Sequence, residues 1–185
     1  MQYKMTVLVL QYNPKFDDLI ITLRSIIRQT GTTYQIVITD DGSVNDYFKE
    51  TESWFKENGF TEYVLVKNEI NQGTVKNICA GLEKASGKYV KLISPGDSLY
   101  CDSTVETVVY EMEKNQAIFA FGKLAFYSLD NELKIYNERR PYSVKPYLKN
   151  DFALIKKHGS HIHDISPYGT IKREWIDYRR TSKEF

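Results

Sequence analysis

The chain has 185 residues, a length that fits one domain of ordinary size with a substantial hydrophobic core. Its apolar content of 42% and charged content of 26% are values of soluble globular proteins and exclude a disordered chain. A formal net charge of +1 argues against nucleic acid as a partner, and no apolar run reaches the length of a membrane helix. The two cysteines form no disulfide framework, and the N-terminal run lacks the features of a signal peptide. We therefore expect a cytoplasmic protein.

Strands and helices alternate along the first 115 residues, in an order typical of a parallel sheet with right-handed crossover helices. Each predicted strand is an apolar run that ends at turn residues, and the predicted helices carry apolar residues at helical spacing. The predicted strands are residues 5–10, 34–39, 63–67 and 89–93. The predicted helices span roughly residues 17–29, 47–58, 74–86 and 103–115, with Gly31 and Gly87 ending the first and the third.

The pattern changes in the second part of the chain. Residues 118–128 and 133–137 read as two strands of a hairpin around an Asp-Asn turn. A basic loop at residues 139–149 follows, and two further helices are predicted at residues 151–157 and 172–180. Because the chain shows no internal repeat and no linker, we expect a single domain with two functional halves, residues 1–100 and 101–185.

Four polar segments come directly after the predicted strands. Because the carboxyl ends of parallel strands share one edge of the sheet, where open α/β folds bind ligands, these segments are expected to meet. Asp and Gly are ordinary turn residues, so each segment taken alone is equally well explained as a solvated turn. Four of them at successive strand ends indicate a ligand site. The segments are Gln11-Tyr12-Asn13, Asp40-Asp41-Gly42-Ser43, Asn71-Gln72-Gly73 and Ser94-Pro95-Gly96-Asp97.

The chemistry of these segments suits a nucleoside diphosphate. Tyr12 offers an aromatic face, and Asp40 and Asp41 offer acceptors for the N–H of a base. Lys76 lies in the first turn of the helix after Gly73, where free N–H groups and the positive end of the helix dipole favour an anion. The chain lacks G-x-G-x-x-G after its first strand and lacks G-x-x-x-x-G-K-[ST]. These absences exclude a common dinucleotide fold, a P-loop and a nucleotidyltransferase with a glycine-rich phosphate loop.

In order and spacing, the strand-end motifs resemble those of the family 2 glycosyltransferases over residues 5 to about 127. The motifs are V-L-V-L-Q-Y-N-P, I-T-D-D-G-S, N-Q-G-T-V-K-N-I-C-A-G-L-E-K-A-S-G-K-Y-V and S-P-G-D-S-L-Y. The resemblance implies the α/β GT-A fold, a Rossmann-like, mostly parallel sheet flanked by helices, with an acceptor-side subregion that is only partial here. It also implies transfer of a sugar, with inversion, from a UDP- or dTDP-linked donor to a glycan or lipid-linked glycan in cell-surface polysaccharide synthesis. Because a lipid-linked acceptor lies in the membrane, the resemblance also implies peripheral association with the inner face of the membrane.

The resemblance also implies roles for individual residues. Tyr12 matches the aromatic residue that packs on the nucleobase, and Asp41 matches the carboxylate that accepts a hydrogen bond from the base, whereas Asp40 fixes the turn. Lys76 stands where the family usually has Arg, so it offers a point charge in place of a planar fork. The implied nucleotide-binding set is Leu10, Tyr12, Asp41, Gly73 and Lys76.

Asp97 matches the last acid of a family cluster, commonly D-x-D-D, that holds Mg²⁺ or Mn²⁺ against the donor diphosphate. Hard oxygen ligands suit such an ion, which neutralises charge on the leaving group. Ser94 and Gly96 stand where the family has acids. We therefore expect a weakened metal site at Asp97, with a simple tight turn as the alternative.

The general base of the reaction has no clear counterpart in the sequence. Family members place it beyond a segment like H-I-H-D-I-S-P-Y-G-T-I-K-R-E-W-I, often in an acidic pair after a Gly-rich turn, and no matching acidic motif remains before Phe185. Asp164 is the nearest stand-in. We therefore expect the chain to be the N-terminal part of a longer protein, and the alternative function is a nucleotide-sugar-binding module without turnover.

The histidine segment and the basic side chains near it leave alternatives open. His161 and His163 are candidates for the acceptor side, and otherwise they are loop residues. Together with His158 they supply too few ligands for a convincing zinc site. The basic side chains make either a solvated face or a surface for lipid phosphates; they are Lys145, Lys149, Lys156, Lys157, Arg179 and Arg180.

Overall fold

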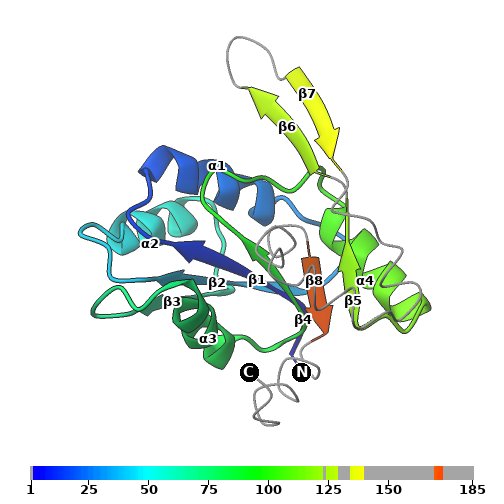
Figure 1. Ribbon diagram of the computed structural model, residues 1–185, viewed down its shortest axis with the longest axis horizontal. Helices are drawn as coiled ribbons and strands as arrows, with labels where there is room; N and C mark the ends of the chain where they lie inside the picture. The colour runs from blue at the N-terminus through cyan, green and yellow to red at the C-terminus, as the bar shows by residue number, and fades with distance from the viewer. Residues whose placement is uncertain (1, 123, 129–133, 140–168, 173–185) are drawn as a thin grey trace, which may run out of the picture.

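A computed structural model describes residues 2–122, 124–128, 134–139 and 169–172 of the chain (Figure 1). The first part alternates strands and helices as predicted: β1 (Tyr3–Gln11), α1 (Phe16–Ile27), β2 (Tyr34–Asp40), α2 (Phe48–Glu57), β3 (Tyr63–Lys67), α3 (Thr74–Lys84), β4 (Gly87–Ile93) and α4 (Thr104–Lys114). Four short strands follow: β5 (Phe119–Phe121), β6 (Leu124–Ser128), β7 (Lys134–Arg139) and β8 (Gly169–Lys172).

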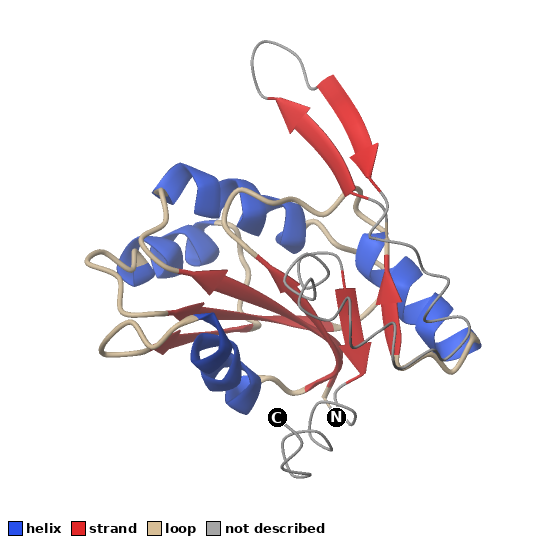
Figure 2. Ribbon diagram, viewed as in Figure 1, coloured by secondary structure: helices blue, strands red, loops and turns tan. Residues whose placement is uncertain are grey.

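The main sheet has six described strands in the order β3-β2-β1-β4-β8-β5. The strands from β3 to β4 are parallel, with Val7 of β1 opposite Ile36 of β2 and Lys91 of β4. β8 lies antiparallel between β4 and β5. Figure 2 shows the sheet in red with helices on both of its faces, and this confirms the predicted α/β class.

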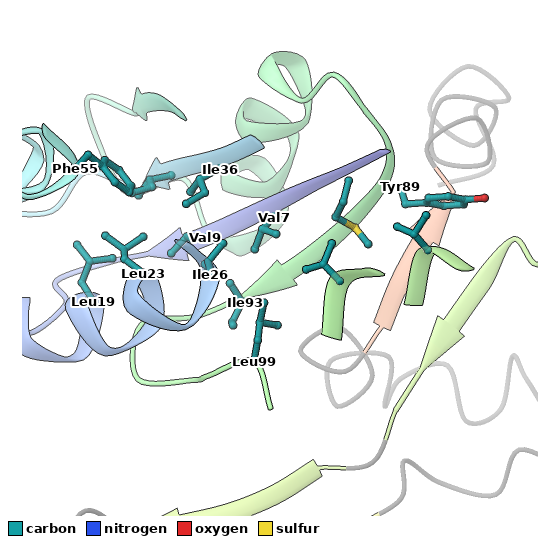
Figure 3. Close-up of a cluster of buried hydrophobic side chains, with 14 of the residues drawn as sticks. Val7, Val9, Leu19, Leu23, Ile26, Ile36, Phe55, Tyr89, Ile93 and Leu99 are labelled. Carbon is teal, nitrogen blue, oxygen red and sulfur yellow. The ribbon is translucent and has the colours of Figure 1, made fainter. Parts of the chain in front are cut away.

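The larger core lies between the sheet and helices α1, α2 and α4. In β1, Val7 and Val9 face this side, and alternate residues of β2 and β4 join them. Leu19, Leu23 and Ile26 of α1 recur at helical spacing and are fully buried against these strands (Figure 3). The periodicity in the sequence therefore identified this face of α1 correctly.

A smaller core covers the other face of the sheet, under α3. It consists of Leu8, Val37, Leu82, Val90 and Leu92, with Leu10 and Ile78 packed at its border. Val75 shares the helical spacing of Ile78 and Leu82, but it is 67% exposed. Thr74 and Lys76 beside it are exposed as well, and Asn77 is the residue of this first turn that faces the sheet.

Two glycines do not act as predicted. α1 ends at Ile27 with Arg28 as its cap, and Gly31 adopts a left-handed conformation in the following loop. Gly87 does not end α3, because it is the first residue of β4. A side chain at Gly87 would place its Cβ 2.3 Å from the backbone N of Thr6, so glycine permits the close approach of β4 to β1.

The second part of the chain differs more from the prediction. The predicted strand at residues 118–128 is two strands: β5 belongs to the main sheet, and β6 pairs with β7 in a hairpin that projects from the body in Figure 1. The predicted terminal helix is wrong at Lys172, which ends β8. The turn at residues 129–133, the helix at residues 151–157 and the remainder of the terminal helix lie outside the described residues. No helix within the described ranges has the length and apolarity needed to cross a membrane.

Candidate functional site

The four predicted segments lie at the carboxyl ends of β1, β2, β3 and β4, and hydrogen bonds join the first three of them. The N–H of Asp41 donates to the carbonyl of Gln11 (3.1 Å), and the N–H of Asn13 donates to Ser43 Oγ (2.7 Å). The first two strand ends are therefore held side by side. Asn13 adopts a positive φ of 45°, a conformation in which Asn is several-fold enriched.

Asp40 is fully buried and fixes the turn after β2, as expected. Its Oδ1 accepts from the N–H of Ser43 (2.8 Å), and its Oδ2 accepts from Ser43 Oγ (2.5 Å) and Gln11 Nε2 (3.0 Å). Burying a carboxylate is costly unless donors surround it, and three donors do so here. Asp40 is thus a structural residue that sets the position of its neighbour, Asp41.

Asp41 is 3% exposed, and its carboxylate accepts three hydrogen bonds from the segment after β3. Asn68 Nδ2 (3.1 Å) and the N–H of Gln72 (3.0 Å) donate to Oδ1, while the N–H of Gly73 (2.9 Å) donates to Oδ2. A carboxylate has room for about four hydrogen bonds. Asp41 therefore ties the end of β2 to the start of α3 and keeps acceptor capacity on Oδ2.

Asn77, a buried residue of α3, completes this junction. Its Nδ2 lies 3.4 Å from the carbonyl of Gln11 and 3.3 Å from that of Thr39, and its Oδ1 accepts from Thr39 Oγ1 (2.7 Å) and Asn68 Nδ2 (3.2 Å). Nothing in the motifs of the sequence predicted a role for Asn77. A polar residue in the first turn of a helix, on the side that faces the sheet, is the signal that could have identified it.

The predicted base-stacking residue is open to solvent. Tyr12 follows β1 directly and is 53% exposed, so its ring is available to a ligand. Leu10, the other predicted nucleotide-binding residue of β1, packs at the border of the smaller core. Leu10 therefore supports the floor of the site, and Tyr12 forms its aromatic surface.

The N-terminus of α3 faces the same edge of the sheet. Gly73 is the N-cap, with φ 88° and ψ 158°, a conformation that glycine adopts most easily. Lys76 lies in the first turn of this helix with an exposed side chain. Free N–H groups, the helix dipole and the lysine together make this end attractive to an anion.

Asp97 lies on a tight turn that α1 holds in place. Thr22 is buried; its Oγ1 donates to the carbonyl of Asp97 (2.7 Å) and accepts from the N–H of Gly96 (2.9 Å). Asp97 is exposed as a residue, but the neighbouring protein removes part of the water around its carboxyl group, and this desolvation raises its pKa. A backbone hydrogen bond from Ser94 and the positive charge of Lys91 oppose that rise. Sequence reasoning missed Thr22, because its position on α1 gives no sign of a contact far along the chain.

The described residues offer few ligands for a metal ion. They contain no group of three or more His, Cys, Asp or Glu side chains that could hold one. Asp18 borders the turn of Asp97, because a Cβ on Gly96 would lie 3.9 Å from Asp18 Cγ. Mg²⁺ commonly takes one or two carboxylates and completes its coordination with substrate phosphates and water. One exposed carboxylate, Asp97, fits that kind of site.

The remaining predicted site residues, His161, His163 and the base candidate Asp164, lie outside the described residues. The structure therefore brings together Tyr12, Asp41, Gly73 and Lys76 at one edge of the sheet. It adds Asn68, Asn77 and Thr22 as residues that hold this edge in shape.

The chain resembles several curated glycosyltransferases. An uncharacterized glycosyltransferase of Rickettsia bellii is 28% identical over 131 residues, 71% of this chain and 18% of that protein. The Campylobacter jejuni GalNAc(5)-diNAcBac-PP-undecaprenol beta-1,3-glucosyltransferase is 23% identical over 163 residues, 88% of this chain and 50% of that protein. The chain spans between 18% and 50% of the length of the curated relatives it matches.

Solved structures share the fold. S. aureus TarS 1-349 in complex with UDP-GlcNAc has a TM-score of 0.69 at 15% identity, over 96% of this chain and 47% of that one. The mannosyltransferase PcManGT from Pyrobaculum calidifontis, in complex with GDP-Man and Mn²⁺, has a TM-score of 0.57 at 18% identity, over 64% of this chain and 35% of that one. These likenesses confirm the GT-A fold. The sequence pattern of Glycosyl transferase family 2 matches residues 6–179, and the chain belongs to this family.

Proposed function

We propose that the chain binds a nucleotide-diphosphate sugar, UDP- or dTDP-linked, at the edge formed by Tyr12, Asp41 and the N-terminus of α3. The sugar passes, with inversion, to a glycan or lipid-linked glycan in cell-surface polysaccharide synthesis. The observation that carries the proposal is the junction at Asp41, where a buried carboxylate with acceptor capacity lies beside an exposed aromatic ring and a helix N-terminus. Family membership and the UDP-GlcNAc complex of TarS support it.

The donor's parts match the groups along this edge. The base stacks on Tyr12 and donates its N–H to Asp41, which favours uracil or thymine over bases that present only an acceptor at that position. The diphosphate lies toward Gly73 and Lys76, where the helix N-terminus and the ammonium group balance its charge. Leu10 supports the base from below.

A divalent cation, Mg²⁺ or Mn²⁺, belongs to this proposal, and Asp97 is the residue that would hold it. When bound, such an ion neutralises the charge that develops on the leaving diphosphate. Thr22 keeps the turn of Asp97 in place from α1. Ser94 and Gly96 contribute no carboxylate, so the affinity for the ion should depend on the donor's own oxygens. The Mn²⁺ in the PcManGT complex supports a metal in this fold.

The acceptor side is assigned to residues 101–185 and the donor side to residues 1–100. For the general base that deprotonates the acceptor hydroxyl, Asp164 is the candidate that the sequence offers, with His161 and His163 beside the acceptor; all three lie outside the described residues. The lipid-linked acceptor named for the Campylobacter relative supports an acceptor of this class and work at the inner face of the membrane. A second candidate function is a module that binds the donor without turnover. It is favoured by Ser94 and Gly96, which stand at two positions of the metal motif where the family has acids.

Calorimetry with UDP, with and without Mn²⁺, tests the assignment. We expect Asp41→Ala to weaken UDP binding about tenfold or more under both conditions, since a hydrogen bond to a charged group is lost. We expect Asp97→Ala to remove mainly the gain that Mn²⁺ provides. Asp102→Ala is the matched control, because that exposed carboxylate pairs with Arg28 at the opposite end of α1.

Equal losses in both variants under both conditions would contradict the separate roles. The two candidate functions differ in turnover. Release of sugar from a UDP-sugar, or its transfer, is expected from the transferase alone, whereas binding is expected from both.

A further inference from the structure

The side chain of Asn68 occupies a position that nothing in the donor proposal uses. It comes directly after β3, and its Nδ2 donates to Asp41 Oδ1 (3.1 Å) and to Asn77 Oδ1 (3.2 Å). Both protons of its amide group are therefore used. Asn68 is the link between the carboxylate proposed to bind the base and the buried amide that joins β1, β2 and α3.

The hydrogen-bond partners fix the orientation of both amides. Asp41 is an acceptor-only group, so the atom of Asn68 that faces it must be the nitrogen. Asn77 faces two backbone carbonyls, of Gln11 and Thr39, with its own nitrogen, so it must turn its oxygen to Asn68. The direction of each hydrogen bond in this network is thus determined, from the carbonyls of β1 and β2 through the two amide side chains to Asp41.

The segment that carries Asn68 is also packed closely against β2. Gly42 has a φ of 75°, and a Cβ there would lie 2.5 Å from the carbonyl carbon of Ile70 and 2.6 Å from the nitrogen of Asn71. These neighbours are backbone atoms, which cannot rotate away as a side chain can. Residues 68–73 are therefore held over the end of β2 by packing at Gly42 and by hydrogen bonds at Asp41.

We propose that Asn68 is a positioning residue for nucleotide binding. Together with the N–H of Gln72 it fills the lone pairs of Asp41 Oδ1, so that a base N–H is directed to Oδ2, which accepts from Gly73 alone among the described residues. The inference rests on the proposed nucleotide site, because it assigns to Asn68 the task of presenting one oxygen of Asp41 to the base.

The substitution Asn68→Asp tests this with a readout that a purely structural role would not move. It keeps the size of the side chain and replaces the donor that faces Asp41 with a carboxyl group. Two carboxyl groups at this separation interact strongly, so one of them holds a proton up to a pH well above its ordinary pKa. When protonated, the introduced carboxyl group can donate to Oδ1 and replace the lost amide. When ionised, it repels Asp41 and disturbs the oxygen presented to the base.

The measurement is the dissociation constant of UDP for the full chain between pH 5 and pH 8. The ratio of variant to parent at each pH removes the titration of UDP itself. We expect Asn68→Asp to bind UDP about tenfold more weakly than the parent at pH 8 and within about twofold of it at pH 5. Asn68→Ala should be weaker at every pH, by a constant factor.

Asn71→Asp is the matched control, with the same change of charge in the same segment. Asn71 Oδ1 accepts from the N–H of Gly73 (3.0 Å), an interaction that a carboxylate can also make. Its ratio to the parent should not vary with pH. Thermal unfolding of each variant at both pH values establishes that the comparison is between folded proteins.

The outcomes separate the two proposals. If the parent binds UDP, Asp41→Ala weakens the binding, and Asn68→Asp shows a flat ratio like that of Asn71→Asp, the positioning role is overturned and the nucleotide site stands. If the parent binds no UDP at any pH, the proposed site fails and the role of Asn68 fails with it. A ratio that falls toward one as the pH is lowered, for Asn68→Asp and not for Asn71→Asp, supports the inference.

Discussion

The close packing at Gly42 leads to a prediction that two glycines of the chain can test against each other. Gly42 and Gly59 both have left-handed backbones, with φ of 75° and 66°. A Cβ on Gly59 would meet nothing within 4 Å, whereas a Cβ on Gly42 would lie 2.5 Å from the backbone of Ile70. Gly59→Ala therefore measures backbone strain alone, and Gly42→Ala measures the same strain together with the packing.

The magnitudes follow from the geometry. A left-handed alanine costs about 1–2 kcal/mol, and this is the whole expected effect of Gly59→Ala. At Gly42 the backbone of residues 70–71 must also move by about 0.9 Å to reach ordinary contact at 3.4 Å. A movement of that size would stretch the bonds from the N–H groups of Gln72 and Gly73 to Asp41 beyond hydrogen-bond length. Each such bond to a charged group contributes about 1.5 kcal/mol or more, so Gly42→Ala should cost about 4 kcal/mol in total.

Urea denaturation of the two variants and the parent, followed by circular dichroism, gives the free energies of unfolding. We expect Gly42→Ala to be less stable than Gly59→Ala by about 3 kcal/mol. Should residues 68–73 open locally instead of destabilising the whole fold, the amides of Gln72 and Gly73 would exchange with solvent much faster in Gly42→Ala alone. If the two variants have the same stability and the same exchange rates, the reasoning about this junction is wrong.

Three further predictions concern the other parts of the site and the core. Thr22→Val should lose about 1–3 kcal/mol of stability and most of the gain that Mn²⁺ gives to UDP binding, whereas Thr22→Ser should keep both. Urea denaturation measures the stability and calorimetry the binding. An unchanged Mn²⁺ effect in Thr22→Val would show that Thr22 does not position Asp97 for the ion. Burial lowers the pKa of Lys91 to about 8, against about 10.4 in an unfolded chain. Between these two pH values the unfolded state binds more protons, so the free energy of unfolding should rise as the pH increases from about 8 to about 10. Lys91→Met should flatten that rise in urea denaturation. An equal rise in parent and variant would show that Lys91 is not its source. Lys76→Ala should weaken UDP binding more at about 20 mM salt than at about 500 mM, because high salt screens the attraction between an exposed ammonium group and the diphosphate. A loss of affinity that is the same at both salt concentrations would show that Lys76 does not act through its charge.

Local patterns predicted the first part of the fold well. Apolar runs and helical spacing identified the elements from β1 to α4, because each of them buries a face that is visible in a short window of sequence. Leu19, Leu23 and Ile26 are an example, since their spacing alone placed α1 on the sheet. Gly87 was misassigned because glycine after a helical pattern usually ends a helix, and only the contact with Thr6 shows why β4 starts with glycine.

Contacts between distant segments were beyond such patterns. β8 pairs with β4 and β5, and its strand partners lie about fifty or more residues earlier in the chain. Residues 118–128 were predicted as one strand, but the chain divides at Gly122, and β5 and β6 belong to different sheets. Which sheet a strand joins depends on the partners available to it, and a short window of sequence does not show these partners.

The candidate site shows the same division. The residue types at the strand ends indicated the site, and Asp40 was correctly expected to fix its turn. The three donors to Asp41 could not be anticipated, because two of them are backbone N–H groups whose positions depend on how residues 68–73 fold over Gly42. Asn68 and Thr22 are ordinary polar residues in the sequence, and their roles come from contacts that β2, α3 and the turn of Asp97 create.

A crystal structure of the chain with UDP and Mn²⁺ would show whether the nucleotide lies at the junction of β1, β2 and α3. We expect the uracil ring to lie on Tyr12 with its N3–H directed to Asp41 Oδ2, while the diphosphate approaches the N-terminus of α3 and the ion binds Asp97. A base bound elsewhere, or bound at Tyr12 with no hydrogen bond to Asp41, would contradict it.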